Sequence, residues 1–131
     1  MLTVIVYSFS YRVGIPQDSS DNGGGFVFDC RSLHNPGRYA EYKEMNGLDE
    51  PVKEFLRKES AVDDFLGAVK VLVRQAVECY IKRDFTNLMV CFGCTGGQHR
   101  SVYCAQYLSD YLKAEYPQIQ VKLIHREQEK K

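Results

Sequence analysis

The chain has 131 residues, which is enough for one domain with its own hydrophobic core. Hydrophobic residues make up 44% of it and aromatic residues 12%, which indicates a folded globule rather than a disordered chain. The 17 basic and 17 acidic side chains cancel, so a nucleic-acid site would have to be a local basic patch. No apolar run reaches the roughly 20 residues that a membrane-spanning helix needs, so we expect no membrane partner.

The N-terminus and the cysteines predict a reduced, cytoplasmic protein. The first residues lack the basic leader and cleavage site of a signal peptide, and we interpret them as a strand. Five cysteines are an odd number, and Cys79, Cys91 and Cys104 lie within apolar periodic segments. Free thiols fit this pattern better than a disulfide framework. Cys91 and Cys94 have the spacing of a metal-binding pair, but no second pair accompanies them, so we expect no metal and no cofactor.

The periodicity predicts seven elements in chain order. Alternating β-branched and aromatic residues predict strands over 3–9, 26–30 and 119–124, and a continuous apolar run predicts a buried strand over 88–92. A short helix follows the N-cap Asp49 to about residue 58, with Pro51 in its first turn. A longer helix starts at a possible capping box, Ser60-Ala-Val-Asp, and a third covers 98–116. Residues 32–47 form a long irregular segment, whose aromatic and basic residues favour a functional role.

This order of elements predicts a small α/β layered domain that spans the whole chain. We expect a mostly parallel sheet of about four strands, flanked by helices. Ligands of such sheets bind beyond the carboxyl ends of the strands. If the first two strands run parallel to strand 88–92, the loops after Ser10 and Phe92 meet there, together with Asp29 and Arg31.

The chain is organised around residues 88–101, in which a strand leads into Gly-Cys-Thr-Gly-Gly-Gln-His-Arg-Ser. Glycines let the backbone turn tightly with its N–H groups exposed, and a helix is expected to begin at Gln98. Strand, glycine-rich loop and helix N-terminus together form an anion site. His99 and Arg100 fall in the first helical turn, where a cation is unfavourable unless an anion offsets it. The alternative is a tight turn with two solvated bases.

Two chemistries are open for this loop. In the first, amides, hydroxyls and a guanidinium hold a phosphate without turnover. These groups belong to Thr95, Gly96, Gly97, Ser101 and Arg100. The second is a cysteine-dependent phosphatase with a Cys94 nucleophile and Arg100 on the phosphate oxygens, since residues 94–101 fit Cys-x-x-x-x-x-Arg-Ser. Gly93 replaces the His that precedes the Cys in that family and no general-acid loop is identifiable, so binding without catalysis is the favoured interpretation.

Residues 93–103 resemble the Gly-Cys-Thr-Gly-Gly-x-His-Arg-Ser-Val segment of the C-terminal domain of RapZ and YvcJ proteins. Further segments agree in the same order, namely 8–16, 26–31 with Asn35-Pro36, 45–52, and the closing His125-Arg126 with Glu129-Lys130. In that family the domain follows an N-terminal Walker-type nucleotide-binding domain. No Gly-x-x-x-x-Gly-Lys-[Ser/Thr] occurs here, so we expect the chain to be a stand-alone C-terminal domain.

The resemblance implies a sensor for a phosphosugar or nucleotide sugar of amino-sugar metabolism. It also implies binding of a small RNA and its presentation to a ribonuclease or other protein partner; a homo-oligomer stays open. Carried over by motif, the loop holds the ligand phosphate, Arg12 stands where the family has Lys or Arg, and residues 29–35 line the neighbouring motif. The predicted site comprises Cys94, Thr95, Gly96, Gly97, Gln98, His99, Arg100, Ser101, Arg12, Asp29, Arg31 and Asn35.

RNA binding would need one basic patch, because the phosphate backbone dominates such affinity. The side chains that would have to meet are Arg12, Arg31, Arg38, Lys43, Lys122, Arg126, Lys130 and Lys131. Glu127 and Glu129 interrupt the basic tail, which is otherwise expected to be a frayed, solvated end. Binding of a phosphorylated small molecule is therefore the favoured function.

Overall fold

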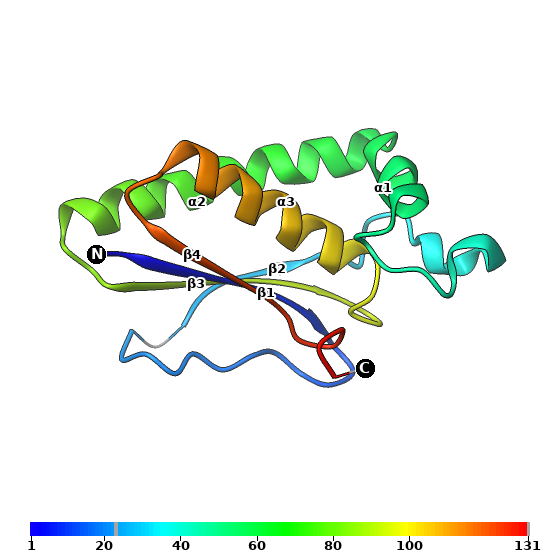
Figure 1. The fold of residues 1–131 in the computed structure, drawn as a ribbon, viewed down its shortest axis with the longest axis horizontal. Coiled ribbons are helices and arrows are strands. Elements are labelled where there is room, and N and C mark those ends of the chain that lie inside the picture. Colours follow the sequence, from blue (N-terminus) through cyan, green and yellow to red (C-terminus); the bar gives the residue numbers. More distant parts are fainter. Residues whose placement is uncertain (23, 131) are drawn as a thin grey trace.

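The computed structural model describes residues 1–22 and 24–130. Within this range the chain forms one sheet and three α-helices (Figure 1). The strands are β1 (Thr3–Ser10), β2 (Gly25–Asp29), β3 (Asn87–Cys94) and β4 (Gln120–His125). The helices are α1 (Glu50–Arg57), α2 (Ser60–Lys82) and α3 (Arg100–Glu115), with the short 3-10 turns η1 (Pro36–Arg38) and η2 (Ala40–Tyr42).

The sheet has the order β2-β3-β1-β4, and every neighbouring pair is parallel. This confirms the predicted α/β layered fold with its parallel, four-stranded sheet. Ser10 lies opposite Cys94, and Asp29 lies opposite Gly93, so β1, β2 and β3 end at the same edge. The loops that follow these strands therefore meet, as the sequence predicts.

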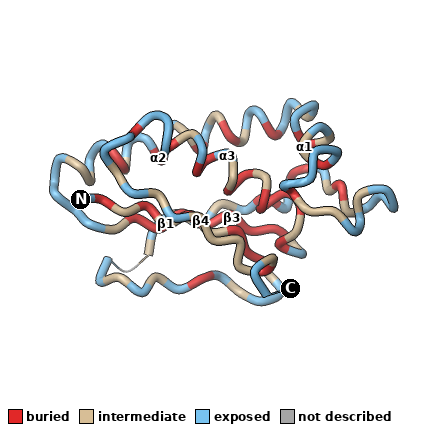
Figure 2. The backbone as a smooth tube through the Cα atoms, viewed as in Figure 1, coloured by how far each residue is buried: buried red, intermediate tan, exposed pale blue. Residues whose placement is uncertain are grey.

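The helices cover one face of the sheet, and the segment after β1 crosses the other (Figure 1). The main core lies between sheet and helices, where Val4, Phe92 and Leu108 are each 0% exposed. A smaller cluster on the far face holds Phe9 and Cys91. Figure 2 shows the buried residues gathered along the strands and on the helix sides that face them. Burial on both faces explains why β3 is the continuous apolar run of the sequence.

Two predicted boundaries at the central loop are wrong by two residues. Strand β3 continues past Phe92 to Cys94, because Gly93 and Cys94 still pair with β1. A Cβ atom at Gly93 would clash with the rings of Phe9 and Tyr11, so any larger residue at this strand position would have to displace the buried Phe9 ring. Helix α3 begins at Arg100 instead of Gln98, with His99 as its N-cap. The loop therefore keeps its predicted length of five residues but is shifted by two residues, from 93–97 to 95–99, and Arg100 is the first helical residue.

Two further expectations for the helix ends and the tail are corrected. Ser60 is the first residue of α2, and its N-cap is Glu59 without a side-chain hydrogen bond, so the capping box does not form. The N-cap Asp49 is confirmed for α1. As far as Lys130, the tail packs against the domain instead of fraying, since Glu127 is only 9% exposed. Among the described residues, no helix combines the length and the apolar character needed to cross a membrane.

Candidate functional site: an anion pocket at the carboxyl edge of the sheet

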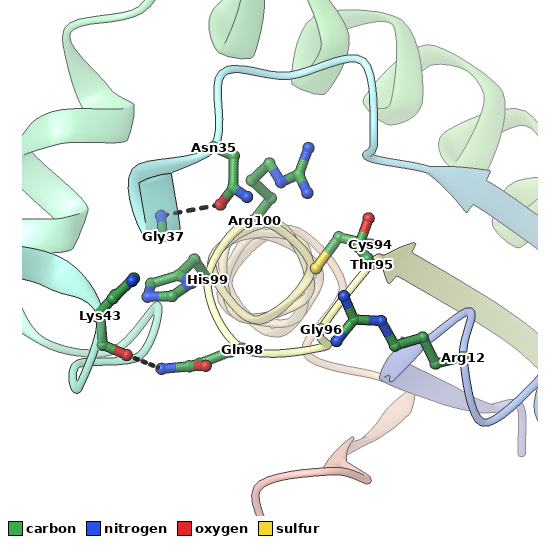
Figure 3. Close-up of a pocket in the computed structure, with 10 residues that line it drawn as sticks. All are labelled: Arg12, Asn35, Gly37, Lys43, Cys94, Thr95, Gly96, Gln98, His99 and Arg100. Atoms are coloured by element: carbon green, nitrogen blue, oxygen red, sulfur yellow. Dashed lines mark hydrogen bonds between the residues drawn. The ribbon is translucent and has the colours of Figure 1, made fainter. Parts of the chain in front are cut away.

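A pocket of about 180 Å³ opens where β1 and β3 end and α3 begins (Figure 3). Its walls come from the turn after β1, the irregular segment before α1, the β3–α3 loop and the first turn of α3. The lining residues are Arg12, Asn35, Gly37, Lys43, Cys94, Thr95, Gly96, Gln98, His99 and Arg100. All but Gly37 and Lys43 belong to the site predicted from the sequence.

The pocket has a strongly positive lining. Arg12, Lys43 and Arg100 are cations, and none of the described lining residues is an aspartate or glutamate. Figure 3 shows Arg12 and Lys43 on opposite sides of the N-terminus of α3. The helix dipole adds partial positive charge at the same place. This combination favours an anion over a neutral or cationic ligand.

The β3–α3 loop is held in place by side chains that donate hydrogen bonds to its main-chain carbonyl groups. The Ser10 hydroxyl donates to the Thr95 carbonyl at 2.6 Å, and the Gln128 amide donates to the Gly97 carbonyl at 3.0 Å. Gly97 has a φ of +63°, a conformation that glycine adopts without strain. Within the described part of the chain, the main-chain N–H groups of Thr95, Gly96 and Gly97 find no acceptor. These donors are available to an anion.

Arg100 has a supporting role as well as a place in the pocket. Its side chain is buried, and Nη1 donates to the carbonyl groups of Arg31 at 2.9 Å and Leu33 at 3.0 Å. Nε is buried and has no partner among the described residues. The guanidinium therefore anchors the turn after β2, and Arg100 is also one of the residues that line the pocket.

Gln98 and His99 attach the irregular segment to the loop. The Gln98 amide donates to the carbonyl groups of Lys43 at 2.7 Å and Met45 at 2.6 Å. Nε2 of His99 donates to the Tyr42 carbonyl at 2.8 Å, so Nε2 carries a proton. Nδ1 then remains for a ligand. These bonds hold the segment that contains Lys43 at the rim of the pocket.

Cys94 lines the pocket with its side chain almost fully buried. Its thiol donates to the Ser101 hydroxyl at 3.1 Å, and Ser101 itself lies beneath the pocket wall. A cysteine-dependent phosphatase also needs a general acid. None of the ten described lining residues is a carboxylic acid. The phosphatase alternative thus stays a prediction that this geometry does not strengthen.

Four predicted residues lie outside the pocket lining: Gly97, Ser101, Asp29 and Arg31. Asp29 and Arg31 form an exposed ion pair at 2.8 Å, and the Arg31 guanidinium stacks 3.8 Å from the Tyr11 ring centre. Hydrogen bonding to the Arg31 side chain lowers the pKa of Asp29 below its usual value. The opposite charges of Asp29 and Arg31 cancel, so the pair adds no net charge beside the pocket.

Sequence reasoning missed two kinds of site residue. The ligand site predicted from the sequence does not include Gly37 and Lys43, although their segment is expected to be functional. A Cβ atom at Gly37 would lie 3.1 Å from the His99 ring, a close approach that only the fold reveals. Glu127 and Gln128, which support the loop from the tail, carry no local signal at all.

The basic residues expected to form an RNA patch have different surroundings in the structure. Arg12 and Lys43 face the pocket, whereas Arg126 and Lys130 pair with Glu127 at 2.9 and 3.3 Å. Lys122 is exposed on β4, and Lys131 lies outside the described residues. RNA binding stays a prediction.

Comparison with known proteins gives consistent matches over most of the chain. The family model described as RapZ C-terminal domain matches residues 2–129. The "Nucleotide-binding protein" of Histophilus somni (strain 2336) is 37% identical over 129 residues, which is 98% of this chain and 43% of that protein. "Nucleotide-binding protein PSHAa2554" of Pseudoalteromonas translucida shows the same identity and coverage, and the Chromobacterium violaceum protein is 38% identical over 82% of this chain and 37% of its own. The chain spans less than half the length of these relatives.

Proposed function

Since the chain belongs to the RapZ C-terminal domain family, we propose that it senses an amino-sugar phosphate or nucleotide sugar by binding it in the anion pocket. The observation that carries this proposal is the set of three cations at the N-terminus of α3, with no carboxylate among the described residues that line the pocket. The names of the relatives, which describe those proteins as nucleotide-binding, agree with a phosphorylated ligand.

Each group has a role in the proposed complex. The N–H groups of the β3–α3 loop and the Thr95 hydroxyl take the phosphate oxygens, while Arg12 and Lys43 supply charge from two sides. Asn35 and Nδ1 of His99 offer polar contacts to sugar hydroxyls. The functional unit is thus the loop together with the two segments that close around it.

The size of the pocket favours the smaller ligand class. Sites that enclose a drug-sized ligand usually measure about 300–1,000 Å³. A cavity of about 180 Å³ is smaller than this. A sugar phosphate would fill it, whereas a nucleotide sugar would extend over the rim.

The test is a thermal-shift series with inorganic phosphate, glucosamine-6-phosphate, UDP-N-acetylglucosamine and unphosphorylated glucosamine. A ligand at about 100 times its dissociation constant stabilises the fold by roughly 2.7 kcal/mol, a shift of several degrees. We expect this shift for phosphorylated ligands and its loss in Arg12→Gln and Lys43→Gln. Arg83→Gln is the matched control, because Arg83 is exposed and lies outside the pocket. An equal shift with glucosamine, or none with any ligand, would contradict the proposal.

A further inference from the structure

The tail after β4 docks a buried carboxylate onto the end of β1. The Glu127 carboxylate accepts a hydrogen bond from the Ser10 main-chain N–H at 2.7 Å. Its charge is balanced by Arg126 at 2.9 Å and Lys130 at 3.3 Å. A buried carboxylate with a main-chain donor and two cations is a specific, fully partnered contact.

Ser10 links this contact to two walls of the pocket. Its hydroxyl donates to the Thr95 carbonyl at 2.6 Å and accepts from the Arg12 main-chain N–H at 3.1 Å. Arg126 also donates from Nη2 to the Gly14 carbonyl at 2.6 Å, so it secures the far end of the turn that carries Arg12. The tail therefore contacts the supports of Thr95 and Arg12.

A second contact joins the tail directly to the loop. The Gln128 amide donates to the Gly97 carbonyl at 3.0 Å. The packing is close enough that a Cβ atom on Gly97 would lie 2.7 Å from Cγ of Glu127. Neither Glu127 nor Gln128 is among the residues that line the pocket.

We infer that Glu127 and Gln128 are positioning residues for the anion pocket, acting through Ser10 and the Gly97 carbonyl. The inference rests on the proposed function, because it assigns the tail to the same site. Docking of the tail orients the loop amides and Arg12 before the ligand arrives, which lowers the cost of ordering them on binding. By linkage, the bound ligand stabilises the docked tail to the same extent.

The first test needs no ligand. Amide hydrogen exchange is followed at Arg12, which donates to Ser10, and at Gly47, which donates to the Gln98 carbonyl beside Gly97. Loss of one hydrogen bond should speed exchange roughly two- to tenfold, at Arg12 in Glu127→Ala and at Gly47 in Gln128→Ala. The matched control is Glu129→Ala, since Glu129 is exposed and directly follows Gln128 in the sequence. Unchanged exchange at both amides would overturn the inference.

The second test measures affinity for inorganic phosphate and glucosamine-6-phosphate. We expect Glu127→Ala and Gln128→Ala to weaken binding by about tenfold, with partial rescue in Glu127→Gln, which keeps an oxygen for the Ser10 N–H. Saturating ligand should also slow trypsin cleavage after Arg126 in the wild type, but leave it unchanged in Arg12→Gln.

The outcomes separate the two proposals. If the wild type binds and both tail variants bind equally well, the positioning role is overturned and the proposed function stands. If no probe binds the wild type, the proposed function fails, and with it the role of the tail in ligand binding; the exchange data then decide only whether the tail supports the loop.

Discussion

Nη1 of Arg100 donates a hydrogen bond to the main-chain carbonyl of Leu33, across 3.0 Å. Nη1 makes a second hydrogen bond, to the Arg31 carbonyl, and the two bonds hold the first residue of α3 beneath the turn that follows β2. Arg100 is also one of the residues that line the anion pocket. Arg100 is therefore a structural residue as well as a candidate ligand-binding residue. A binding defect in its variants can come from loss of the structural bonds or from loss of a contact to the ligand.

Substitution of Arg100 by alanine should destabilise the fold. The change leaves the carbonyl groups of Arg31 and Leu33 without their donor and empties a buried site, so the free energy of unfolding should fall by roughly 2–4 kcal/mol. Urea unfolding measures this loss. Arg38→Ala, at an exposed position, should stay within about 0.5 kcal/mol of wild type. An Arg100→Ala protein as stable as the wild type would show that the two bonds contribute nothing.

The two neighbouring glycines of the loop should respond differently to alanine. Gly97 has φ +63°, and a Cβ atom there would lie 2.7 Å from Glu127 and 2.9 Å from the Ser10 nitrogen. Gly96 has nothing within 4 Å of its Cβ position. We expect Gly97→Ala to cost about 1–3 kcal/mol and Gly96→Ala less than about 0.5 kcal/mol in urea unfolding. Equal costs would contradict the docked tail.

The parts of the fold that the sequence predicts are those with local signals. Strand β3 is recognisable because a central parallel strand is apolar on both faces. Six of the residues that line the pocket lie within one motif, residues 94–100. Lys43 is not recognisable as a pocket residue, because side-chain bonds from Gln98 and His99 place its segment. Pairing with β1 and β2 extends β3 through Gly93 despite the low strand propensity of glycine.

The tail illustrates the same limit more strongly. Local charge predicts that Glu127 is solvated, yet its partner Ser10 is 117 residues away in the sequence. A long-range contact to a main-chain N–H leaves no pattern in the sequence, because every residue except proline carries that donor.

Acid should release the tail. Burial alone would raise the pKa of Glu127, but the Ser10 N–H and Arg126 outweigh it and hold the pKa below its ordinary value of 4.5. The folded protein then binds this proton less readily than the unfolded chain. The stabilising contribution is present above about pH 4.5 and is lost as the pH falls through the lower folded value.

The measurement is the unfolding midpoint from pH 6 to pH 3 for wild type and Glu127→Gln. Below about pH 4.5 the wild-type midpoint should fall more steeply. Asp18 and Asp29 also have lowered pKa values, through hydrogen bonds to Ser20 and Arg31 respectively, but they contribute equally in both proteins. Parallel profiles would show that the carboxylate charge of Glu127 is not coupled to folding.

Cys94→Ser separates binding from phosphatase chemistry. The Cys94 thiol donates to the Ser101 hydroxyl at 3.1 Å, and a serine hydroxyl can make the same bond. For a binding site, we expect affinity for glucosamine-6-phosphate to stay within about threefold of wild type. We also expect no difference between the two proteins in phosphate release from an aryl phosphate, because no described lining residue is a carboxylic acid that could protonate the leaving group. Turnover by the wild type that disappears in Cys94→Ser would instead make Cys94 a nucleophile and the pocket an active site.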